Sequence, residues 1–190
     1  MSKGRLEAFS DGVLAILITI MVLELGVPHE PTLAALLPLV PVFLSYILSF
    51  IFLGIYWNNH HHLLQATKQV NGSVLWANLH LLFWLSLVPF TTAWMGETEF
   101  EALPVAVYGL VLLLAAIAYY MMARALVTLH GAESPLAIAL GKDVKGKISP
   151  ILYLLAIPLA FVSPWISCGL YVLVAAMWLV PDRRIEKTIS

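Results

Sequence analysis

Two polar side chains, Ser10 and Asp11, lie near the start of an apolar run that extends from Phe9 to Val27. A carboxylate inside a bilayer costs a few kcal/mol unless it is paired, hydrogen-bonded or in contact with water. Asp11 therefore needs a partner, and other apolar runs also contain polar groups. The candidate partners in a polar network are Asn58, His60, His61, Asn78 and His80.

Three interpretations of these groups follow from their types and spacing. Asp11 can belong to a structural network or contact a permeating ion, and we expect the network. Alternatively, Ser10 caps a helix that begins near Asp11, where the helix dipole favours an acid. We expect His80 to be hydrogen-bonded within the core rather than to relay protons, because intramembrane polar groups commonly pair.

The elements that must position these groups are membrane-spanning helices. Of the 190 residues, 61% are hydrophobic and only 11% are charged, against about 25% charged in soluble domains. This composition excludes an ordinary soluble enzyme, and a net charge of −1 offers no basic field for nucleic acid. We therefore expect an all-α integral membrane protein with one domain over residues 1–190. The predicted spans are Phe9 to Val27, Pro38 to Trp57, Val70 to Trp94, Leu103 to Leu129, Ile148 to Phe161 and Pro164 to Val180.

The distribution of charge predicts the orientation of these six spans. With a cytoplasmic N-terminus, all ten Lys and Arg residues fall on the inner side, whereas Glu30, Glu97, Glu99 and Glu101 fall outside. This agrees with the positive-inside rule. We expect a multi-pass protein of the plasma membrane with both termini cytoplasmic, and a short interfacial helix around Pro135 to Leu140 on the inner side. The outer acids form either a solvated loop or a vestibule that attracts cations.

One face of the first helix carries an apolar stripe. At about 100° per residue, Ile16, Ile20 and Leu23 fall within about 60° of one another, and Thr19 lies at the edge of the stripe. Asp11 is turned about 140° from Ile16. Such stripes usually face lipid or a protein core. If this stripe instead faces an axis, Asp11 faces neighbouring helices.

The pattern Arg5-x-x-x-Phe9-Ser10-Asp11, followed by a wholly apolar continuation, resembles the signature of the endolysosomal potassium channel family in its single-repeat bacterial members. The resemblance extends over the whole chain, including the end of the second span and the core of the third. It implies a homotetrameric, potassium-selective leak channel whose four first helices line a central pore.

The resemblance also implies roles for individual residues. Ile16 would form the main hydrophobic constriction, and Thr19, Ile20 and Leu23 would line the rest of the pore. Arg5, Phe9, Ser10 and Asp11 would hold the first helix against its neighbours. The partners implied are the other subunits, potassium ions and the bilayer, with no cofactor. Independently of the resemblance, the chain contains no T-V-G-Y-G segment, which excludes a carbonyl-lined filter of the usual kind.

Other classes of function fit the sequence less well. A secondary transporter predicts internal repeats and paired broken helices, which the sequence lacks, and a proton-conducting protein is a further alternative. An enzyme is not expected, because neither a G-x-S-x-G nor an H-E-x-x-H motif is present. Adjacent histidines on a helix point in different directions, so we expect no metal site at His60, His61 and His62.

Overall fold

A computed structural model describes residues 2–131, 133–140 and 144–179, and these residues form helices and connections without any strand. The elements are α1 (Lys3–Leu23), the 3-10 helix η1 (Leu33–Leu39), α2 (Val40–Gln65), α3 (Gly72–Ser86), α4 (Val88–Glu97), α5 (Ala102–His130), α6 (Pro135–Leu140), α7 (Val144–Leu159) and α8 (Pro164–Leu179). The prediction of an all-helical chain is confirmed for this part.

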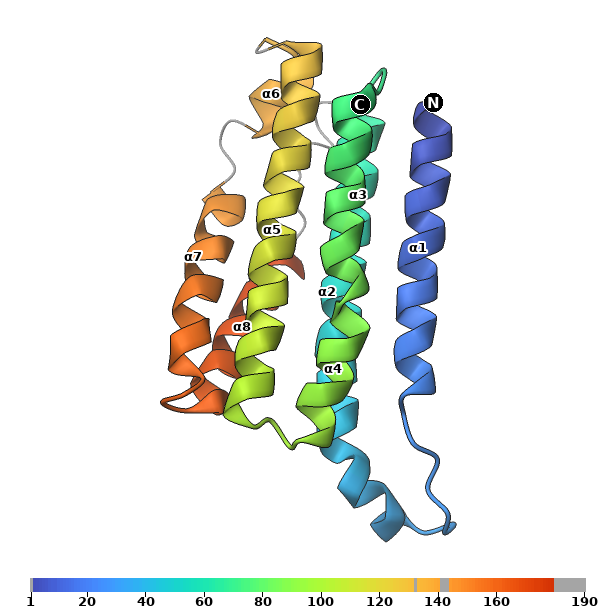
Figure 1. The fold of residues 1–190 in the computed structure, drawn as a ribbon, viewed down its shortest axis with the longest axis vertical. Helices are drawn as coiled ribbons and strands as arrows, with labels where there is room; N and C mark the ends of the chain where they lie inside the picture. Colours follow the sequence, from blue (N-terminus) through green and yellow to red (C-terminus); the bar gives the residue numbers. More distant parts are fainter. Residues whose placement is uncertain (1, 132, 141–143, 180–190) are drawn as a thin grey trace.

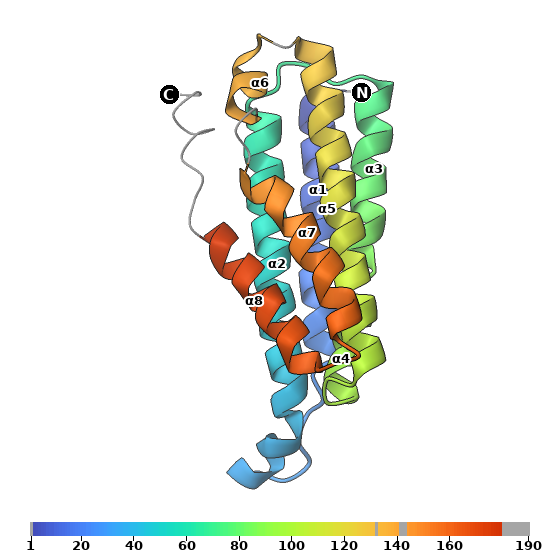
Figure 2. The same cartoon turned by 90° about the vertical axis from the view of Figure 1, so that its left-hand side faces the viewer.

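The long helices run up and down along one axis (Figure 1). The α1 helix runs antiparallel to α2 and parallel to the α3–α4 pair, and α5 returns beside α3. The α7–α8 hairpin packs on α5 and leans across the bundle (Figure 2). The α1 helix thus lies at one side of the bundle, in contact with α2, α3 and α4.

Several helix ends differ from the predicted spans, and prolines explain two of the differences. The third predicted span is divided into α3 and α4 near Leu87, because Pro89 lacks an N–H group and its ring clashes with the preceding turn. The second span is preceded by η1, which contains Pro38, and α2 continues to Gln65. The helix α1 begins at Lys3, so Ser10 does not cap it, and that alternative is wrong. The short helix Pro135–Leu140 forms as predicted.

Four helical stretches are long and apolar enough to cross a membrane: Lys3–Leu23, Leu33–Gln65, Gly72–Glu97 and Ala102–His130. The helices α7 and α8 have 16 residues each, which is about 24 Å at 1.5 Å per residue. The hydrocarbon core of a bilayer is about 30 Å thick. The four long stretches therefore support four crossings, whereas α7 and α8 are shorter than the hydrocarbon core. The chain is a multi-pass membrane protein.

The described Lys and Arg residues all lie toward one end of the bundle, together with the acids Glu7, Asp11 and Glu133. The end at which α1 begins and α5 ends, called the basic end, carries the described basic residues Lys3, Arg5, Lys68, Arg124, Lys145 and Lys147. The opposite, acidic end carries Glu24, Glu30, Glu97, Glu99 and Glu101. The other four basic residues, Lys142, Arg183, Arg184 and Lys187, lie outside the described residues.

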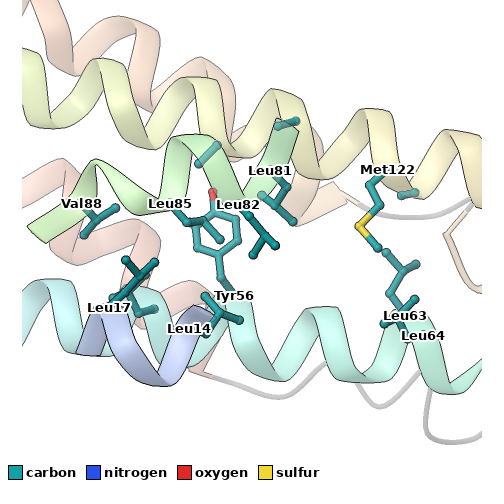
Figure 3. Close-up of a cluster of buried hydrophobic side chains, with 14 of the residues drawn as sticks. Leu14, Leu17, Tyr56, Leu63, Leu64, Leu81, Leu82, Leu85, Val88 and Met122 are labelled. Carbon is teal, nitrogen blue, oxygen red and sulfur yellow. The ribbon is translucent and has the colours of Figure 1, made fainter. Parts of the chain in front are cut away.

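Apolar packing fixes α1 against the bundle. Leu14 and Leu17 point from α1 toward Tyr56 of α2 and toward the end of α3 (Figure 3). They belong to a buried cluster that also includes Leu85, Val88 and Met122. The burial of each such side chain contributes about 1.5–3 kcal/mol in water, whereas in lipid close packing replaces most of that driving force. The rotation of α1 about its own axis is thereby set.

Gly96 permits a close approach of α4 to α2. A Cβ atom on Gly96 would lie 2.6 Å from Ser45 Oγ and 2.8 Å from Val42 Cα, which is a backbone atom. We predict that Gly96→Ala lowers the free energy of unfolding by about 1–3 kcal/mol, because overpacking must separate α4 from α2. Unfolding in mixed detergent micelles measures the loss. Gly54→Ala is the matched control, since no atom lies within 4 Å of its Cβ position; equal losses in both variants would contradict the packing argument.

Candidate functional site

The helix α1 has one buried face. Leu6, Ser10, Leu14, Leu17 and Met21 are buried, and their spacing of four, four, three and four residues keeps them on one side of the helix. This side packs against α2, α3 and α4. No other described helix packs against the remaining circumference of α1.

The predicted stripe lies on this unpacked side. Ile16 is 58% exposed, Ile20 39% and Leu23 80%. Thr19 is also exposed, and its hydroxyl donates to the Ile16 carbonyl oxygen at 2.9 Å. That bond uses the hydroxyl proton within the helix, so the Thr19 oxygen can still accept a bond or contact a cation. All four residues assigned to a pore are therefore available to face other copies of the chain or an axis.

A buried polar network joins α1 to α2 and α3. The Asn78 side-chain amide donates to Ser10 Oγ at 3.0 Å, and Ser10 Oγ lies 2.9 Å from the Leu6 carbonyl oxygen, to which it donates. His60 Nε2 lies 2.7 Å from Asn78 Oδ1. Since Asn78 Oδ1 is an acceptor, His60 must carry its proton on Nε2. Ser10, His60 and Asn78 are each at most 1% exposed.

The partner of Asp11 is Trp57, which was not among the predicted candidates. The Trp57 indole N–H donates to Asp11 Oδ1 at 3.0 Å, and the Trp57 ring stacks on His61 with centroids 6.1 Å apart. His61 Nδ1 in turn lies 3.2 Å from Glu7 Oε1. Two acids one helical turn apart on α1 thus contact two rings one turn apart on α2.

The other predicted residues lie apart from this network. Asn58 is exposed on α2, and His80 accepts a hydrogen bond from Trp84 Nε1 at 2.9 Å within α3. Arg5 is exposed, and Phe9 is 50% exposed. Neither side chain has a hydrogen bond or ion pair to any described residue, so within one chain the motif residues divide into a packed pair, Ser10 and Asp11, and an outward pair.

Trp57 lies at the end of the span predicted from Pro38 to Trp57. Its position at the end of a predicted span is typical of the aromatic belt at the membrane surface. Because α2 continues for two more turns to Gln65, Trp57 lies within the helix, level with Asp11. Trp57 lies one turn before His61 on α2, and Asp11 lies one turn after Glu7 on α1. The Trp57–Asp11 contact therefore lies one turn along from the His61–Glu7 contact.

We predict that Trp57→Phe lowers stability by roughly 1 kcal/mol, because it removes a hydrogen bond to a charged group that is partly exposed while keeping an aromatic ring. Trp76→Phe is the control, since Trp76 is 75% exposed. Thermal unfolding of both variants in detergent provides the measurement. A loss in Trp76→Phe as large as that in Trp57→Phe would show that the indole bond to Asp11 contributes nothing.

No group of three or more His, Cys, Asp or Glu side chains in the described ranges is arranged to hold a metal ion. The three adjacent histidines illustrate the reason. His60 turns inward to Asn78, whereas His61 lies beside Glu7. The arrangement at α1 offers a helix held on one side by the bundle and an exposed face on the other that is apolar except for the Thr19 hydroxyl.

Comparison with known proteins places this arrangement in a class. The family model "Endosomal/lysosomal potassium channel TMEM175" matches residues 5–89, which include most of α1, the polar network and α3. A crystal structure of a lysosomal potassium-selective channel TMEM175 homolog from Chamaesiphon minutus superimposes with a TM-score of 0.83 at 30% identity, over 95% of this chain and 97% of the other. The fold is therefore that of an ion channel.

Relatives by sequence agree with the structural match. A potassium channel of Chryseobacterium sp. is 57% identical over 190 residues, which is 100% of this chain and 99% of the relative. The human protein named endosomal/lysosomal proton channel TMEM175 is 36% identical over 96 residues, which is 44% of this chain and 19% of that protein. This chain belongs to the TMEM175 family of potassium channels. Proteins of this family are ion channels rather than enzymes.

Proposed function

We propose that this chain forms a homotetrameric, potassium-selective leak channel in which four α1 helices surround the ion path. The observation that carries the proposal is the outer face of α1, where Ile16, Thr19, Ile20 and Leu23 are exposed although the opposite face is fully packed. One helix cannot enclose a path, so the face must repeat around an axis, and closed cyclic symmetry is the usual arrangement of identical subunits.

In this arrangement Ile16 forms the narrowest ring. An apolar ring resists ion passage by losing its water, which is a known way for a pore to gate. Thr19 lies about 60° from Ile16 and one turn closer to the acidic end, where its oxygen can replace part of the hydration shell of a cation. Passage along such a pore is passive and needs no cofactor.

The proposal places the basic end at the cytoplasmic face of the plasma membrane and treats α7 and α8 as two further, tilted or shallow crossings. The support is that the described Lys and Arg residues all lie toward one end of the bundle, which matches the positive-inside rule. The apolar helix α8 and the antiparallel course of the α7–α8 hairpin also fit two crossings. Labelling of a single introduced cysteine in the turn at Ser163 from outside would support this topology.

The proposed function is tested by ion flux into liposomes that contain the purified full chain. We expect electrogenic uptake of K⁺ that exceeds uptake of Na⁺, together with a tetrameric mass in native mass spectrometry. A pH-sensitive dye inside the same liposomes measures proton entry. Proton entry is measured because the human relative is named a proton channel. Equal K⁺ and Na⁺ uptake would contradict selectivity, and proton flux without K⁺ flux would favour the proton-conducting alternative.

The acidic end supplies a further prediction. Glu97, Glu99 and Glu101 lie exposed at the α4–α5 turn, which is tight because Glu99 and Phe100 have φ values of 52° and 65°, and α4 contacts α1. We predict that replacing the three acids by Gln reduces K⁺ conductance several-fold at about 0.01 M salt but not at about 1 M, where the Debye length falls to about 3 Å. Single-channel recording at both salt concentrations measures the effect.

The control for this prediction is Glu133→Gln, because Glu133 is exposed near the opposite end of the bundle. This substitution should leave the K⁺ conductance unchanged at either salt concentration. A reduction by the triple substitution that is the same at both concentrations would contradict an electrostatic vestibule and favour a merely solvated loop.

A further inference from the structure

A cavity of about 240 Å³ lies between α2, α5, α6, α7 and α8, away from the outer face of α1. It lies within one chain, so it does not depend on how copies of the chain assemble. Its lining changes in character along the bundle axis. Toward the basic end it includes Arg124, Lys147 and Asn59, and deeper in the bundle it includes Phe52, Ala116 and Tyr153.

Among the described residues, the two cations that line the cavity toward the basic end have no counter-charge. Arg124 and Lys147 are both exposed, and within the described chain neither side chain has a hydrogen bond or ion pair. Among the described residues that line the cavity, none is Asp or Glu. Two unpaired cations that share one cavity favour an anionic occupant.

The deeper part of the cavity favours an apolar occupant. Ala116 lies eight residues before Arg124 on α5, which is about 12 Å along the helix axis. The aromatic walls are held in place by bonds of their own: Trp178 Nε1 donates to Ser149 Oγ at 2.9 Å, and the Tyr119 hydroxyl donates to the Asn59 carbonyl oxygen at 3.3 Å. An amphiphile with a negative head toward the basic end and an apolar tail toward Phe52 matches this gradient.

We propose that this cavity binds the phosphate headgroup and the first part of an acyl chain of an anionic phospholipid from the leaflet at the basic end. Basic pockets between helices on the cytoplasmic side are suited to such headgroups, and the clustered cations place this cavity at that membrane surface. Arg124 and Lys147 bind the phosphate, and the space beside Ala116 accepts the chain.

Binding to the purified full chain in detergent tests the proposal, with dioctanoyl phosphatidylglycerol as the probe and native mass spectrometry as the readout. We expect dioctanoyl phosphatidylcholine and inorganic phosphate each to bind at least tenfold more weakly. The pair Arg124→Gln and Lys147→Gln should weaken phosphatidylglycerol binding roughly thirtyfold, as expected for two surface cations. Ala116→Phe, which fills the cavity without changing charge, should weaken it as well.

The control pair is Lys3→Gln with Lys68→Gln, which removes the same charge at the same end outside the cavity. It should leave phosphatidylglycerol binding unchanged. Equal loss in the control pair would show general surface attraction and would overturn the site. Equal binding of phosphatidylcholine would overturn the role of the cations, and equally tight binding of inorganic phosphate would show a simple anion site with no lipid. None of these readouts depends on ion conduction.

Discussion

An Ile16→Asn substitution is expected to raise K⁺ flux through reconstituted protein about tenfold and to reduce the preference for K⁺ over Na⁺. Four amides would hydrate a ring that in the wild type is apolar, which removes the dewetting barrier. A barrier lowered by only about 1.4 kcal/mol raises a rate tenfold. Because Ile16 is 58% exposed and lies away from the buried face of α1, the substitution should leave the fold of each subunit intact.

The matched control is Val22→Asn on the same helix. Val22 is 45% exposed, but it is turned about 120° from Ile16, so it introduces the same amide away from the proposed pore. Liposome flux with K⁺ or Na⁺, together with native mass spectrometry, compares the two variants with the wild type. If tetrameric Ile16→Asn protein shows wild-type flux and selectivity, Ile16 does not form the constriction.

The second large effect is expected from Asn78→Leu, which should lower the free energy of unfolding by about 2 kcal/mol. Asn78 is the centre of the network that ties α1 to α2 and α3, and it is fully buried. Its loss leaves the His60 Nε2–H group buried without an acceptor, and an unsatisfied buried donor costs about 1–3 kcal/mol. Ser10 would retain only its bond to the Leu6 carbonyl oxygen.

Two variants separate this network effect from a general effect of substitution. Asn58→Leu changes the same residue type at an exposed position on α2 and should alter stability by less than about 0.5 kcal/mol. Adding His60→Leu to Asn78→Leu should restore part of the loss, because removing both partners leaves no unpaired group. Unfolding in detergent measures all three variants, and a double variant less stable than Asn78→Leu alone would contradict the network as described.

The sequence by itself determined the class of protein and the faces of its first helix. Composition and apolar runs predict spanning helices because a bilayer requires them, and the helical period places Ile16, Ile20 and Leu23 on one side whatever α1 packs against. The motif residues Ser10 and Asp11 lie on the bundle-facing part of α1, because an acid and a hydroxyl in an apolar helix require partners. The family was also identified from these residues.

Only the tertiary structure decided which partners they have. Hydrogen bonds between helices depend on the depth and rotation of each helix. Depth and rotation are set by the packing of apolar residues such as Leu14 and Leu17, and their sequence pattern does not indicate which polar groups will meet. Asp11 therefore meets Trp57 rather than a residue from the predicted set, and Asn78 joins Ser10 to His60 while His80 pairs within its own helix. The cavity beside Arg124 and Lys147 likewise arises from five helices that are distant in sequence, because a void is a property of packing and not of any one segment.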